Sequence, residues 1–103
     1  MKDTIYTVPE LRQIISPIAK AYGVDRIYLF GSYARGSADA DSDIDLRVDK
    51  GPLKGLFALG ALYSDLEDGL GKKIDMLTTG SLDEEFLDSI GKEEILIYDR
   101  QQS

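Results

Sequence analysis

The spacing of apolar residues predicts a helix near the start of the chain. After Thr7, apolar side chains recur every three or four residues, which is the period of a helix with one buried face. Thr7 and Glu10 have the spacing of a capping box, and Gly23 is typical of a helix end. Pro17 lies inside this pattern and predicts a kink or a break. The predicted buried stripe is Leu11, Ile14, Ile15, Ile18 and Tyr22.

Four short β-rich or alternating segments predict strands, at residues 24–30, 43–49, 73–77 and 94–98. In the second segment the apolar residues share one face, and alternation puts the charged residues on the other face. The apolar set is Ile44, Leu46 and Val48, and the charged set is Asp43, Asp45 and Arg47. In the third segment, Asp75 points away from the core side that Ile74 and Met76 face.

The segments between these strands predict the remaining helices. A glycine-flanked turn at residues 31–37 leads into a short helix. Residues 53–68 predict a helix that ends at Gly69 and Gly71. Ser81 with Glu84 predicts the cap of a further helix. The inward positions are Leu56, Leu59, Tyr63 and Leu66 in the first of these two helices, and Leu82, Phe86, Leu87 and Ile90 in the second.

The resulting element order, αβαβαβαβ, predicts the fold class. It is α/β (α+β), a small mixed β-sheet with helices packed against it. The connection between strands 24–30 and 43–49 is too short for a full crossover helix, so this pair is expected to be antiparallel. No repeat or linker divides the chain, and residues 1–103 are expected to form a single domain.

Composition restricts the chemistry more than the fold. The chain has no Cys and no His, which excludes disulfides, thiolate nucleophiles, Ser-His-Asp triads and His-ligated zinc. Acids, bases and metal ligands must therefore come mainly from carboxylates, which favour hard cations. No segment approaches the ~18 apolar residues of a membrane span or resembles a signal peptide, so a cytoplasmic location is expected.

The charge balance argues against direct binding of nucleic acid, which needs a basic surface. The net charge is −7, and the acidic excess lies in the second half, where residues 51–103 carry 5 basic and 11 acidic side chains. A solvated helix face is the ordinary explanation of this excess, and a docking surface for a basic partner is the alternative.

The stretch GSYARGSADADSDIDL, residues 31–46, carries the candidate chemistry. Gly31 and Gly36 have the glycine spacing of a Walker phosphate loop, but Ser37 stands where that loop needs Lys. Alternating aspartates from Asp39 suggest a calcium loop, yet the required Gly and Glu positions hold Ile44 and Lys50. Both interpretations fail on an essential residue.

A third interpretation accounts for more of the stretch. Gly31 allows close backbone approach to a phosphate, and Ser32 adds a hydroxyl donor at a helix start. Farther along, Asp43 and Asp45 lie on one strand face, and Asp75 lies on the corresponding face of another strand. Either feature alone is typical of turns and solvated edges. Together, three carboxylates beside a phosphate-binding turn predict metal-dependent phosphoryl or nucleotidyl transfer.

These residues resemble a known family. Gly31-Ser32, ten intervening residues, then Asp43-x-Asp45, with Ala34-Arg35-Gly36 between, is similar to the signature of the DNA-polymerase-β-like nucleotidyltransferases. Length and motif resemble its minimal, MNT-type members, and the looser similarity extends over residues 8–99. The resemblance implies that Asp43, Asp45 and Asp75 bind two magnesium ions and that Gly31 and Ser32 hold the triphosphate of ATP.

Two arginines near the motif have several possible roles. Arg35 could bind phosphate and is counted with the nucleotide-binding residues, but an ion pair on the helix surface is an equal alternative. Arg47 departs from the apolar or neutral residue that the resemblance leads us to expect. It could neutralise the aspartates, contact substrate or point past the site into solvent.

The resemblance also implies a partner. MNT-type proteins pair with HEPN-domain toxins in hetero-oligomeric toxin–antitoxin modules and transfer AMP to a tyrosine of the toxin. The leading hypothesis is therefore an antitoxin-like, magnesium-dependent protein adenylyltransferase. One alternative is a catalytically silent antitoxin that binds its partner through the acidic segment 83–94. Another is a small-molecule nucleotidyltransferase that acts on an antibiotic such as an aminoglycoside.

Overall fold

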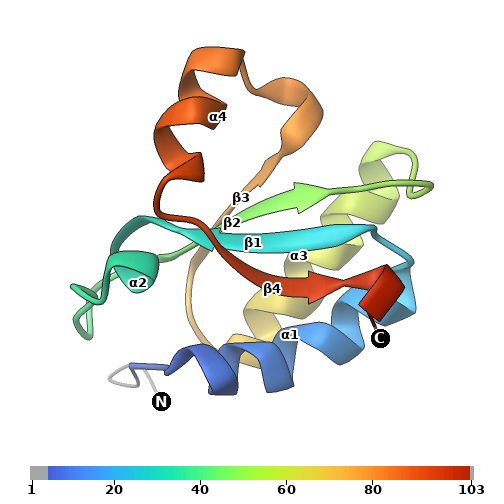
Figure 1. Cartoon of the computed structure of the whole chain (residues 1–103). Helices are drawn as coiled ribbons and strands as arrows, with labels where there is room; N and C mark the ends of the chain where they lie inside the picture. The colour runs from blue at the N-terminus through green and yellow to red at the C-terminus, as the bar shows by residue number, and fades with distance from the viewer. Residues whose placement is uncertain (1–4, 103) are drawn as a thin grey trace.

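The computed structural model describes residues 5–102, which form a four-stranded mixed sheet with helices on both of its faces (Figure 1). The helices are α1 (Val8–Tyr22), α2 (Gly31–Arg35), α3 (Leu56–Leu70) and α4 (Glu84–Gly91). The strands are β1 (Arg26–Phe30), β2 (Ile44–Asp49), β3 (Ile74–Thr78) and β4 (Ile95–Asp99). The predicted element order and fold class are confirmed, and the strand ends differ from the predicted ones by one or two residues.

The strand order in the sheet is β3-β2-β1-β4. Strand β1 pairs antiparallel with both β2 and β4, which confirms the expectation drawn from the short β1–β2 connection. Strand β2 pairs parallel with β3, and the long connection through α3 makes this direction possible. The sheet is therefore mixed, with β3 and β4 at its edges.

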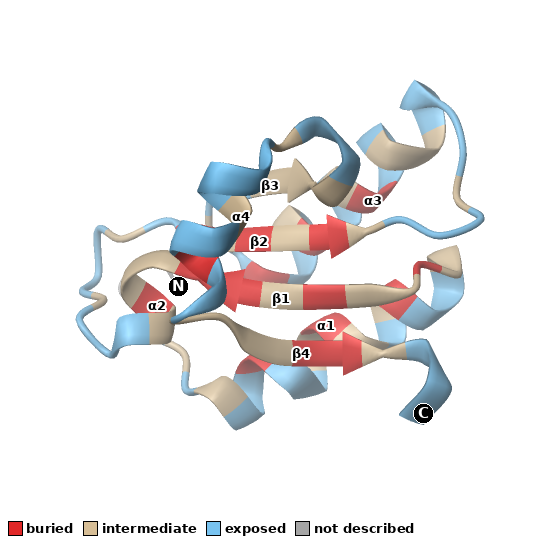
Figure 2. Cartoon of the chain, turned by 45° about the horizontal axis from the view of Figure 1, so that its top comes forward, coloured by how far each residue is buried: buried red, intermediate tan, exposed pale blue. Residues whose placement is uncertain are grey.

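The core lies between the sheet and one helical layer. Helices α1 and α3 cover one face of the sheet, and α4 lies on the opposite side (Figure 1). Burial alternates strictly along β2, as Figure 2 shows, which confirms the predicted inward position of its three apolar residues. The fully buried helix residues are Leu11, Ile15 and Ala19 of α1 and Leu62, Leu66 and Leu70 of α3. No helix within residues 5–102 is both long and apolar enough to cross a membrane.

Helix α1 has the predicted caps but is not broken at Pro17. The Thr7 hydroxyl accepts a hydrogen bond from the Glu10 N–H, and the Glu10 carboxylate accepts one from the Thr7 N–H. The proline ring leaves the Gln13 carbonyl without its helical partner. Gln13 and Pro17 both lie on the exposed face, where water can satisfy that carbonyl, so the helix continues to Tyr22.

Three predicted helix details are wrong, and the first is the inward position of Phe86, which is 38% exposed. Helix α3 begins at Leu56, whose side chain is 87% exposed instead of facing inward, because the first turn of the helix extends beyond the core. Helix α4 is capped by Asp83, whose carboxylate accepts from the Phe86 N–H, and not by Ser81. The Ser81 hydroxyl instead donates to the Thr78 carbonyl within a separate 3₁₀ turn, Thr79–Ser81.

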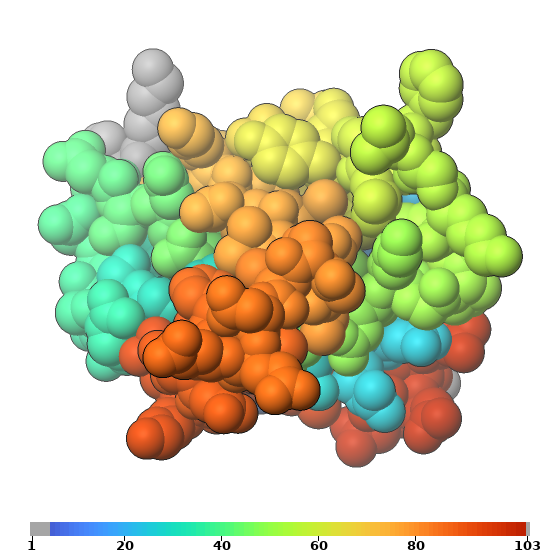
Figure 3. Space-filling view, turned by 90° about the horizontal axis from the view of Figure 1, so that it is seen from above, coloured from blue at the N-terminus to red at the C-terminus, as the bar shows by residue number. Residues whose placement is uncertain are grey.

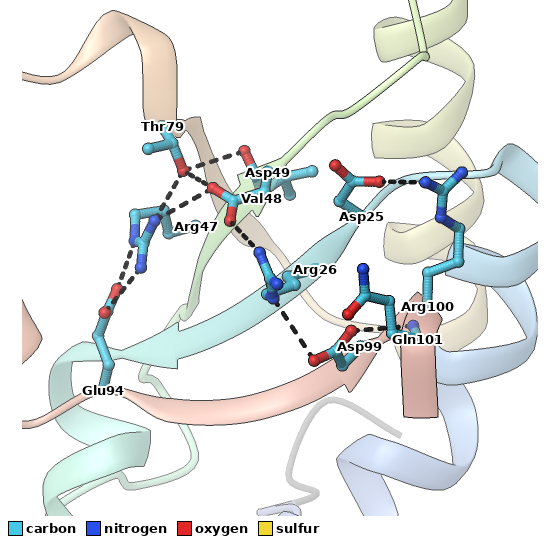
Figure 4. A network of polar contacts seen from close by, with 10 residues as sticks. All are labelled: Asp25, Arg26, Arg47, Val48, Asp49, Thr79, Glu94, Asp99, Arg100 and Gln101. Carbon is cyan, nitrogen blue, oxygen red and sulfur yellow. Dashed lines mark hydrogen bonds and ion pairs between the residues drawn. The ribbon is translucent and has the colours of Figure 1, made fainter. Parts of the chain in front are cut away.

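The face of the sheet opposite the core holds a cluster of charges around Arg47 (Figure 4). The Arg47 guanidinium donates two hydrogen bonds to the Glu94 carboxylate, one of 2.8 Å, and one of 2.7 Å to the Thr79 hydroxyl. It also contacts Asp49 at 3.2 Å and lies 4.2 Å from the ring centroid of Tyr28. These contacts join β2 to β1, to the 3₁₀ turn and to the residue before β4.

The contacts of Arg47 match none of the three roles considered for it: neutralising the aspartates of the motif, contacting substrate, or pointing into solvent. The Arg47 side chain is only 11% exposed, so it does not point into solvent, and Glu94 and Asp49 take its charge. Glu94 is 10% exposed, so this pair is largely removed from water. We assign Arg47 a structural role on this face of the sheet, and not a role in neutralising Asp43, Asp45 and Asp75.

Replacing Arg47 by Met is expected to lower the free energy of unfolding by about 2–4 kcal/mol, because it leaves the largely buried Glu94 carboxylate without its counter-charge. Arg35→Met provides the control, since the Arg35 ion pair is 54% exposed on the arginine side and is expected to contribute below about 1 kcal/mol. Urea unfolding of both variants measures the difference. Equal losses would contradict the assignment.

Candidate active site

The site begins where β1 ends. The structure has no separate turn at this point, contrary to prediction, because α2 starts directly at Gly31 and ends before Gly36. Gly31 has a φ of +74°, and a Cβ atom built on it would lie 2.0 Å from an Asp45 carboxylate oxygen. Only glycine therefore allows this backbone conformation together with this close approach to Asp45.

The register of the sheet places the three aspartates at the same end. Asp45 of β2 lies opposite Phe30, the last residue of β1, and beside Asp75 of β3. Asp43 precedes β2 by one residue and is exposed, as is Asp75, whereas Asp45 is half-buried. The structure thus brings together Asp43, Asp45 and Asp75, and it places Gly31 against them.

The pKa of Asp45 is raised above its ordinary value. Burial is the main cause, followed by repulsion from the Asp75 and Asp43 carboxylates, and Arg35 offsets only part of this effect. The site therefore carries more negative charge than its surroundings neutralise. A bound cation would relieve this repulsion.

Oxygen donors of this kind suit a hard divalent cation such as magnesium. Within residues 5–102, no three acidic side chains lie close enough together to hold a metal ion in their present positions. Asp43 and Asp75 are exposed, so their side chains have room to rotate toward Asp45. The donor set fits magnesium by its chemistry, with Asp45 as the most buried member.

The predicted phosphate-binding residues lie beside the aspartates. Gly31, Ser32 and Arg35 all belong to the short helix α2, so the backbone N–H of Gly31 and the side chains of the other two come from one helical turn. The Arg35 side chain is 54% exposed and forms an ion pair with Glu93 at 3.2 Å. Glu93 also accepts a hydrogen bond from the Gly31 N–H at 3.3 Å. Sequence reasoning did not identify Glu93, because it lies 62 residues from Gly31 and belongs to no motif.

A cleft of about 610 Å³ adjoins Asp43. It is lined by residues 40–43, by residues 71–73 and by Glu67 of α3. The Lys72 ammonium donates to the Ala40 carbonyl at 3.0 Å, which holds the two lining loops together. The cleft provides space for part of a substrate next to the aspartates.

Comparison with known proteins identifies the family. Residues 12–103 match the family described as "Polymerase beta, Nucleotidyltransferase". The chain belongs to this family. It is a nucleotidyltransferase, as the motif around Gly31 and Asp43 indicated.

Two relatives of this chain carry names of protein adenylyltransferases, a subclass of the nucleotidyltransferases. The nucleotidyltransferase is 35% identical over 80 residues to the protein adenylyltransferase MntA of Thermococcus cleftensis, covering 74% of this chain and 81% of that protein. It is 43% identical over 75 residues to a Methanocaldococcus jannaschii protein that bears the name "Putative protein adenylyltransferase". The match covers 73% of this chain and 81% of that protein.

Solved structures support the fold. A structure described as that of a "putative minimal nucleotidyltransferase" is 28% identical to this chain, with a TM-score of 0.77. The match covers 89% of this chain and 97% of that one. A toxin–antitoxin complex with AMP-PNP contains a chain that is 24% identical, with a TM-score of 0.74, and the match covers 88% of this chain and 75% of that one. At that identity the second likeness shows the fold alone.

The contact between Gly31 and Asp45 can be tested by substitution. Gly31→Ala and Gly36→Ala are each expected to lose about 1–2 kcal/mol of unfolding free energy, because both glycines have positive φ. Gly31→Ala is expected to lose roughly 1 kcal/mol more, because the new methyl group forces the Asp45 side chain from its rotamer. A Cβ on Gly36 meets nothing within 4 Å, which makes it a matched control. Equal losses in urea unfolding would show that the close approach carries no cost.

The raised pKa of Asp45 predicts a pH-dependent effect of Asp45→Asn. A carboxyl whose pKa is raised by folding makes the folded state less stable as pH rises through that pKa. The variant is therefore expected to be more stable than the wild type at pH 7 in metal-free buffer, and its advantage should shrink toward pH ~4, the ordinary Asp pKa. Thermal melts across this range measure it, with the exposed Asp88→Asn as control. An advantage independent of pH would argue against the raised pKa of Asp45, from burial and from the neighbouring carboxylates, as the cause.

Proposed function

We propose that this nucleotidyltransferase transfers AMP from ATP to a tyrosine hydroxyl of a HEPN-type partner, and so acts as an antitoxin in the cytoplasm. The observation that carries the proposal is that the register of the strands places Asp43, Asp45 and Asp75 at the end of the sheet where Gly31 begins α2. The similar protein from Thermococcus is a protein adenylyltransferase. A structural neighbour is an MNT antitoxin in complex with an AMPylated HEPN toxin of Shewanella oneidensis, at 20% identity.

The nucleotide would bind through α2. The Gly31 N–H, the Ser32 hydroxyl and the Arg35 guanidinium are the donors that a triphosphate would use. The missing side chain at Gly31 lets the Asp45 carboxylate lie directly against the start of α2. Asp43, Asp45 and Asp75 would hold two magnesium ions, which when bound would supply the positive charge that neutralises the phosphates and the carboxylates.

The reaction is a displacement at phosphorus. The acceptor oxygen forms a bond to the α-phosphorus, the bond from that phosphorus to the bridging oxygen breaks, and pyrophosphate leaves. Asp75 would accept the proton of the acceptor hydroxyl, because its carboxylate is exposed. Asp75 lies on the edge strand β3, so a hydroxyl carried by another protein can reach it from outside the sheet. This position favours a partner-borne acceptor in a hetero-oligomer.

The proposal predicts label transfer that depends on Asp43. The protein is incubated with ATP labelled at the α-phosphate, magnesium and the protein encoded by the neighbouring gene, which the proposal expects to be of the HEPN type. The partner is expected to acquire label on tyrosine, and Asp43→Ala is expected to reduce the rate at least about a hundredfold, because a metal ligand is lost. Omission of magnesium should abolish labelling.

Asp68→Ala is the matched control, since Asp68 is an exposed aspartate of α3 that does not line the cleft and is not among the three site carboxylates. It should label the partner at close to the wild-type rate. If the partner acquires no label in the presence of the wild-type protein, the enzymatic proposal is contradicted. Neutralisation of the partner's toxicity by Asp43→Ala as fully as by wild type would favour an antitoxin that acts by contact alone.

A further inference from the structure

The carboxylate of Glu93 occupies the donors that the proposed function assigns to the triphosphate. Its Oε1 atom accepts from the Gly31 N–H at 3.3 Å and from the Arg35 guanidinium at 3.2 Å, and its Oε2 atom lies 3.4 Å from the same guanidinium nitrogen. A carboxylate and a phosphate accept hydrogen bonds from the same kinds of donor. These contacts show that Gly31 and Arg35 together bind an oxyanion.

The segment around Glu93 is held in place from both sides. The N–H groups of Glu93 and Glu94 both donate to the Ile90 carbonyl at the end of α4, each at 3.0 Å. The Glu94 side chain is bound to Arg47, on the other side of the segment. These contacts position the Glu93 carboxylate toward α2.

Helix α4 itself packs next to the site. The rings of Phe86 and Phe30 meet edge-on with centroids 6.3 Å apart, and Phe30 is the residue directly before Gly31. Figure 2 shows the end of α4 close to α2, and Figure 3 shows the orange side chains of α4 over this face of the sheet. The position of Glu93 therefore follows from the packing of α4 against the start of the site.

We propose that Glu93 is an internal competitor of the nucleotide's triphosphate, which must displace this carboxylate from Gly31 and Arg35 in order to bind. The inference rests on the proposed function. Two anions cannot share the same donors without strong repulsion, so binding of the phosphates frees the Glu93 carboxylate and removes one attachment of the segment that joins α4 to β4. Occupancy of the nucleotide site is thereby coupled to the attachment of α4.

The test compares Glu93→Gln with Glu85→Gln, which makes the same chemical change at an exposed position of α4. The probe is inorganic triphosphate in magnesium buffer, and its dissociation constant is measured by calorimetry. Glu93→Gln is expected to bind roughly three- to tenfold more tightly than wild type, as loss of a partly exposed competing ion pair predicts. Glu85→Gln is expected to stay within about twofold, because its charge lies outside the site. Glu93→Ala provides a second variant, and melts verify that each protein is folded.

A second measurement separates displacement from a general charge effect. Addition of triphosphate to wild-type protein should accelerate amide hydrogen exchange at Glu93 and Glu94. Glu93→Gln in an Arg35→Met background should gain little affinity. Wild-type binding with no gain in Glu93→Gln, or with unchanged exchange, would overturn the competitor while leaving the proposed function intact. Absence of triphosphate binding in every variant would overturn both. Binding gains without label transfer to any partner would leave the competitor standing and count against the adenylyltransferase.

Discussion

The close approach of Gly31 to Asp45 is the contact on which the site depends. Antiparallel pairing sets the end of β1 opposite Asp45, and the missing side chain at Gly31 lets α2 start at once. Parallel pairing of β2 with β3 then adds Asp75 on the other side of Asp45. Two pairing directions in one small sheet thus place a short helix and three carboxylates at the same end of the sheet.

Strand β2 carries one charged side chain that is paired with opposite charges and one that lies beside like charges. Arg47 is buried and its charge is matched by Glu94 and Asp49. Asp45, two residues earlier, is half-buried beside like charges, and its pKa is raised as a result. The matched group stabilises the face of the sheet, and the unmatched group is available for a cation or substrate. This contrast follows the general expectation that strained or repelled charges gather at functional sites.

Much of this site was predictable from local pattern. Alternation along β2 correctly separated the buried Ile44, Leu46 and Val48 from the charged face, because side chains in a strand point alternately to either side. The side chain of Leu56 was misplaced, because helical periodicity does not show where the core beneath a helix ends. The direction of Arg47 was not predictable, because Glu94 and Thr79 approach it from distant parts of the chain.

The sequence alone determined the order of the elements, the family motif and the set of carboxylates available for chemistry. These properties follow from periodicity, caps and spacing within about twenty residues, where the geometry of helix and strand is regular. Only the tertiary structure decided that Arg35 and Gly31 both contact Glu93 and that Arg47 belongs to a separate cluster. Such contacts depend on how α4 and β4 return to the sheet, and ion pairs between distant residues leave no periodic trace in a sequence.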